Sequence, residues 1–103
     1  MEELQQVVYR YTVQVGEELQ IPWHLTSKVV HTAILDGEPE YVHFWVRHPV
    51  PDSGVAPFYR NFYVVSTGHL FPHKDIVEGV AVWEGPPRLV WQLVRREPGH
   101  TYN

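Results

Sequence analysis

The chain has 103 residues, the usual size of a single domain, and it contains no cysteine. The absence of cysteine excludes disulfides, thiolate metal sites and cysteine nucleophiles. Twelve acidic residues against eight Lys and Arg give a net charge of −4, which argues against a protein that follows the backbone of a nucleic acid. We therefore expect one domain over residues 1–103 and no nucleic-acid partner.

The first half of the chain carries the two-residue period of β-strands. Apolar and polar residues alternate over 6–15, which predicts a half-buried strand. A short strand follows over 19–21, and Pro22 places it at a sheet edge or a strand end because proline cannot donate to a ladder. Two further strands are predicted over 28–35 and 41–48, joined by a turn rich in Asp, Gly and Pro.

The second half repeats this pattern after a proline-rich connection over 49–57. Strands are predicted over 58–65, 77–83 and 89–96, and the polar segment 96–103 is expected to be a frayed tail. No segment of ten or more residues keeps a helical period. Seven strands with short turns predict an all-β fold, a small antiparallel β-sandwich or partly open barrel.

One turn concentrates the candidate chemistry. The strand after the proline-rich connection ends in a small polar turn that presents His69, and Gly68 supplies the positive φ that such a turn requires. Trp45 adds an aromatic anchor on an earlier strand. The candidate binding residues are Ser66, Thr67, Gly68, His69, His73 and Trp45. The plainer interpretation is that His69 holds the turn through a hydrogen bond from its ring to a backbone group.

Catalytic interpretations of this turn are weaker. His69 with His73 or Asp75 could hold a metal ion, but Pro72 prevents the helix on which an i, i+4 pair would converge. Ser66, His69 and Asp75 could form a triad, yet the chain has no Gly-x-Ser-x-Gly elbow. We expect no catalytic residues, no metal and no cofactor.

The aromatic residues are too numerous for one thin core. Trp23, Trp45 and Trp83 cannot all enter it, and Trp and Tyr side chains that lie outside a core favour interfaces. The alternation of Tyr with Arg around Arg10 could also form a platform on which a base stacks. Unpaired edges at residues 19–21 and at the last hairpin offer further surfaces for association.

The order of motifs resembles a family of small all-β proteins of bacteriophages and prophages. That family has a Tyr-containing strand, a Trp-containing strand leading into a proline-rich loop, a Gly-Thr-Gly-His turn and a closing Val-Trp strand. The corresponding segments here are 9–15, 44–51, 62–69 and 89–95. Ser66 replaces the first Gly of the turn, and Leu70 replaces the Pro that usually follows His. The resemblance implies an origin and a fold, not a mechanism.

These observations favour a non-enzymatic accessory protein that binds a protein partner or a second copy of itself. A small-molecule or nucleotide binder with a pocket near Ser66–His69 is the alternative, and a small metal-dependent hydrolase is the third. The chain begins with Met1-Glu2-Glu3 and has no apolar run near the roughly 18 residues of a membrane span. We therefore expect action in the host cytoplasm and no membrane partner.

Overall fold

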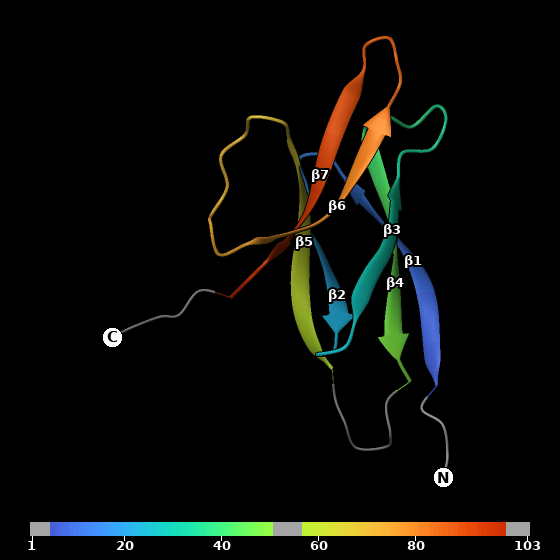
Figure 1. Ribbon diagram of the computed structural model, residues 1–103, viewed down its shortest axis with the longest axis vertical. Helices are drawn as coiled ribbons and strands as arrows, with labels where there is room; N and C mark the ends of the chain where they lie inside the picture. Colours follow the sequence, from blue (N-terminus) through green and yellow to red (C-terminus); the bar gives the residue numbers. More distant parts are fainter. Residues whose placement is uncertain (1–4, 51–56, 99–103) are drawn as a thin grey trace.

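The computed structural model describes residues 5–50 and 57–98, which form seven strands and no helix (Figure 1). The strands are β1 (Gln6–Gln14), β2 (Leu19–Trp23), β3 (Lys28–Ala33), β4 (Tyr41–Pro49), β5 (Phe58–Ser66), β6 (Ile76–Trp83) and β7 (Leu89–Arg96). Sheet A has the order β1-β4-β3, sheet B has the order β2-β5-β7-β6, and all pairs are antiparallel. The two sheets pack as an open sandwich, which confirms the predicted all-β fold.

The predicted strands are all present, with ends that differ from the expected ones by no more than two residues. Both predicted edges are confirmed, because β2 and β6 are the outer strands of sheet B. The proline-rich connection falls largely on residues 51–56, which lie outside the described part of the chain. Within the described residues, no helix is long and apolar enough to cross a membrane.

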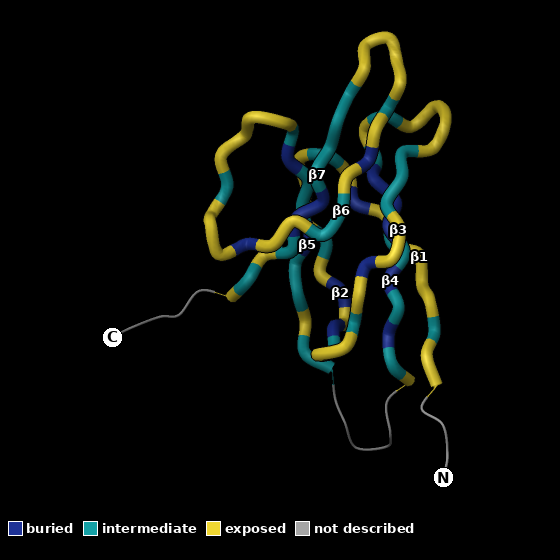
Figure 2. The backbone as a smooth tube through the Cα atoms, viewed as in Figure 1, coloured by how far each residue is buried: buried dark blue, intermediate teal, exposed yellow. Residues whose placement is uncertain are grey.

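The core lies between the sheets and takes residues from both of them, and Figure 2 shows the buried segments in dark blue on the strands. Val42, Phe44 and Val46 alternate along β4 and are fully buried, as the sequence predicts. The ring of Phe44 stacks on Phe62 of β5, with centroids 5.0 Å apart. Such large-ring contacts supply much of the apolar burial available to a small sandwich.

Of the three tryptophans that cannot all enter the core, Trp23 is the one that does: it is 4% exposed, and its ring centroid lies 5.3 Å from that of Phe62. The alternation of β2 directs Ile21 and Trp23 toward the same inner face, so the strand that Pro22 confines to an edge still adds two core side chains. Trp45 and Trp83 remain half-buried.

A buried carboxylate fixes the segment that leads into β6. The Tyr63 hydroxyl donates to Oδ2 of Asp75 at 2.5 Å, and the backbone N–H of Glu97 donates to Oδ1 at 3.0 Å. Burial, followed by the hydrogen bond to Asp75, raises the pKa of Tyr63 well above its ordinary value of 10.0. Glu97, expected in the frayed tail, is therefore held against the sandwich, and residues 99–103 lie outside the described part.

Candidate functional site

The predicted turn at the end of β5 forms as a structural element. The N–H of His69 donates to the Ser66 carbonyl at 3.1 Å, and Gly68 has φ of +90°. The Ser66 hydroxyl and Nδ1 of His69 are 2.8 Å apart. The ring of His69 thus holds the turn through a side-chain hydroxyl, where a backbone group was expected. Thr67 lies exposed beside it and receives a long hydrogen bond of 3.4 Å from Gln92.

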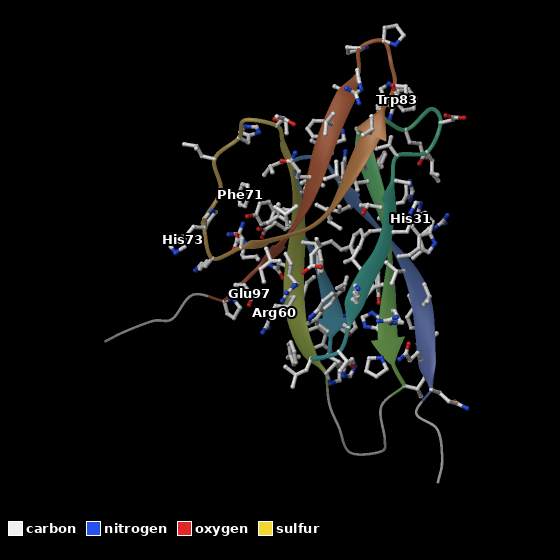
Figure 3. The ribbon with its side chains drawn as sticks, viewed as in Figure 1. His31, Arg60, Phe71, His73, Trp83 and Glu97 are labelled. Atoms are coloured by element: carbon white, nitrogen blue, oxygen red, sulfur yellow. The ribbon has the colours of Figure 1, made fainter. Side chains whose placement is uncertain are left out.

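The other candidate residues lie elsewhere. His73 is exposed in the loop before β6, whereas Trp45 belongs to sheet A and packs 5.1 Å from the ring of His31. Figure 3 shows His73 and His31 on opposite sides of the molecule. Asp75 uses both carboxylate oxygens on Tyr63 and Glu97, so Ser66, His69 and Asp75 form no relay. Among the described residues, no three His, Asp or Glu side chains are placed to hold a metal ion.

The surface beside Ser66 and Thr67 is a shallow hollow of about 260 Å³. Its other lining residues are Arg88, Leu89, Val90 and Trp91. Neither His69 nor His73 is among the residues that line this hollow.

A better-formed pocket lies where β1, β2 and β4 meet at one end of the sandwich. It has a volume of about 180 Å³ and a largely apolar lining. Its lining residues are Val7, Tyr9, Tyr11, Pro22, His24, His48, Pro49 and Val50. The two-residue period explains it, because His48 continues the inner face of Phe44 and Val46.

His48 is the polar centre of this pocket and is only 5% exposed. Its Nδ1 lies 2.8 Å from the Ser27 hydroxyl, and its Nε2 lies 3.0 Å from the Tyr11 hydroxyl. Ser27 Oγ also accepts the backbone N–H of His24 at 2.9 Å. The ring of Trp23 meets His48 edge-on, with centroids 6.1 Å apart. Both ring nitrogens of this buried histidine are therefore satisfied.

The electrostatics of the pocket keep these groups neutral. Burial lowers the pKa of His48 from its ordinary 6.5, and the neighbouring His24 lowers it further. Burial also raises the pKa of Tyr11, and Tyr9 adds to that shift. Near neutral pH the pocket therefore presents an uncharged imidazole and a protonated phenol inside an apolar rim.

The hydrogen-bond pattern suits binding better than nucleophilic attack. Ser27 bonds Nδ1 of the imidazole, and no described carboxylate contacts either nitrogen of His48 to stabilise a positive ring. Nε2 faces the hydroxyl of Tyr11, which is itself one of the residues that line the pocket. A largely apolar pocket with a few polar groups of this kind suits the binding of an apolar group.

Sequence reasoning missed this site because its contacts are long-range. Tyr11 and His48 are 37 positions apart, and Ser27 and His48 are 21 apart. One signal was present: His48 occupies a core-facing position of a strand whose other core residues are aliphatic or aromatic. A histidine at such a position needs polar partners, and these mark a candidate site.

The family comparison covers nearly the whole chain. A model for a domain of unknown function, DUF7352, matches residues 4–101. The chain belongs to this family. No curated protein and no solved structure matches it. For this DUF7352 member, function is therefore argued from the site alone.

Proposed function

We propose that this DUF7352 chain is a non-enzymatic binding module whose His48 pocket receives one apolar side chain of a partner protein. The observation that carries the proposal is the size of the pocket. Its volume of about 180 Å³ lies below the roughly 300–1,000 Å³ typical of small-molecule sites. A space of this size, open on one side, suits a single projecting side chain.

The rim of the pocket has the composition of a protein interface. Tyr9 is 54% exposed and Val50 is 44% exposed, so both offer contact area around the opening. Tyrosine is enriched among the residues that dominate binding energy, particularly beside pockets that exclude water. Tyr11 also lines the pocket, and the hydrogen bond between its hydroxyl and Nε2 of His48 holds its ring in place.

Selection from a displayed library of random peptides tests this proposal. We expect peptides with a shared apolar anchor to be enriched on the wild-type protein. Tyr9→Ala should weaken the selected peptide by at least about tenfold, the loss that accompanies about 1.4 kcal/mol. Leu70→Ala is the control, because Leu70 is 97% exposed in the loop after β5 and does not line the pocket, and it should change nothing. Failure to enrich any peptide, or equal binding by the Tyr9 variant, would contradict the proposal.

Self-association through β6 is a second candidate, favoured by a different observation. β6 is an outer strand of sheet B, and its Val77, Val80 and Val82 are 46%, 51% and 38% exposed. The strand has no Lys or Pro of the kind that protects sheet edges. Sedimentation velocity should then show a concentration-dependent dimer that Val80→Lys abolishes. A monomer at every concentration would exclude this candidate.

Cellular context stays a prediction from the order of the sequence motifs. A phage origin and action in the host cytoplasm would agree with a small accessory binding protein. The genes flanking homologous coding sequences test this, because early host-takeover genes and virion genes cluster separately in phage genomes.

A further inference from the structure

A cluster of cations surrounds a tryptophan on the outer face of sheet A. Because Val42, Phe44 and Val46 point into the core, Trp45 and Arg47 point away from it. The register places Arg10 on β1 and His31 on β3 on either side of Trp45, and Lys28 beside Arg47. We call these five residues, Arg10, Lys28, His31, Trp45 and Arg47, the cationic face.

The charges of the chain are segregated with respect to this face. β1, β3 and β4 contain no Asp or Glu, although the whole chain has a net charge of −4. Within the described ranges, Arg10, Lys28 and Arg47 make no ion pair, whereas the arginines of β5 and β7 are all paired with carboxylates. Glu38 is paired with His43, which lies two positions before Trp45 on β4.

An aromatic surface lies at the centre of the cations. The rings of His31 and Trp45 have centroids 5.1 Å apart, and His31 is exposed on the outer side of β3 (Figure 3). Neighbouring strands are about 4.8 Å apart, so the row Arg10–Trp45–His31 is about 10 Å wide. A nucleotide whose planar base stacks on this row would have its neighbouring phosphates within reach of the flanking cations.

We propose that the cationic face binds single-stranded nucleic acid, with a base stacked on Trp45 and phosphates held by Arg10, Lys28 and Arg47. Stacking on an aromatic side chain requires an unpaired base, so a flat sheet face of this kind favours single strands over duplexes. An acidic peptide would satisfy the cations but would leave the rings of Trp45 and His31 unused. The net charge argues against a nucleic-acid partner only as an average over the whole chain. The fold places the acidic residues and these cations on different surfaces.

Fluorescence anisotropy with a labelled oligodeoxythymidine of about twelve nucleotides tests the proposal, since single-strand sites cover roughly 4–16 nucleotides. Affinity measured between about 50 and 200 mM salt should fall with a log–log slope of about −2, as expected for three neutralised phosphates. Arg10→Ala should reduce that slope by about 0.7. Trp45→Leu should weaken binding about tenfold and leave the slope unchanged, since a stacked base adds affinity without neutralising a phosphate.

Two controls make the result specific. Lys74→Ala removes an exposed cation in the loop before β6 and should leave affinity and slope as in the wild type. Arg10 is exposed on its strand, so its variant gives a result even if Trp45→Leu fails to fold. The proposal is overturned if the oligonucleotide does not bind at about 50 mM salt. It is also overturned if inorganic polyphosphate, polyglutamate or a duplex of equal length binds as tightly, or if Lys74→Ala weakens binding as much as Arg10→Ala.

Discussion

Replacement of His48 by Gln should change how stability depends on pH. Burial lowers the pKa of His48 below 6.5, so protonation favours the unfolded chain. Above about pH 6.5 the imidazole is neutral in both states and adds no pH dependence. As the pH falls below 6.5, the unfolded state gains protons first, and the free energy of unfolding decreases.

The structure sets the size of this effect. At about pH 5.5, one unit below the ordinary pKa, His48 can lower the free energy of unfolding by no more than about 1.4 kcal/mol. Gln can replace the contact of Nε2 with Tyr11 but loses the bond of Nδ1 to Ser27. The variant should therefore be about 1 kcal/mol less stable than the wild type near pH 7.5, the usual net value of one hydrogen bond.

Urea denaturation of both proteins at about pH 5.5 and 7.5 measures these quantities. The difference in free energy of unfolding between the wild type and His48→Gln should be smaller at the lower pH. Only the wild type loses stability there, because its unfolded chain gains a proton at His48. The exposed His73→Gln removes a histidine without touching the pocket and should keep the wild-type difference between the two pH values. A gap that stays constant or widens at low pH would refute the burial of a neutral His48.

Three further substitutions test the packing around the sites. Phe62→Ala should cost about 3–5 kcal/mol in urea denaturation, because Phe62 is fully buried against two aromatic rings. Tyr63→Phe should cost about 1.5–3 kcal/mol and speed hydrogen exchange at the Glu97 amide, since it removes a donor to the buried Asp75 carboxylate. Gly79→Ala should destabilise by about 1–3 kcal/mol, because its Cβ would clash with Thr32 Oγ1, and Thr32→Ala should recover much of that loss.

Each of these expectations has an opposing outcome. If Phe62→Ala lowers the free energy of unfolding by less than about 1 kcal/mol, the two sheets do not share this core. If hydrogen exchange at the Glu97 amide is unchanged in Tyr63→Phe, the bond between Tyr63 and Asp75 does not help to hold that segment. Additive losses in the Gly79 and Thr32 double variant would show that β3 and β6 do not meet there.

The fold was predictable because the two-residue period marks β1 and β4 clearly and turn residues separate the remaining strands. In β4 the alternation of Val42, Phe44 and Val46 identifies the buried face without any knowledge of the partner strands. The turn at Gly68 was equally readable, since a small polar segment after an apolar strand needs a residue with positive φ. For both β4 and the turn at Gly68, the local sequence pattern is enough to predict the local structure.

The sites were less predictable because register and sheet order create them. Tyr11 meets His48 only after β1 pairs with β4, and Ser27 reaches the same ring from the segment before β3. The burial of Trp23 likewise follows from the pairing of β2 with β5. Composition alone could not show that Arg10 would share an acid-free face with other cations, because net charge carries no spatial information.

The most direct test of the His48 pocket is the position of a selected peptide on the protein. Nuclear Overhauser contacts between the apolar anchor of an enriched peptide and the wild-type protein should identify Tyr9, Tyr11 and His48 as its neighbours. Contacts that place the anchor on β6, or anywhere away from these three side chains, would contradict the assignment of this pocket as the binding site.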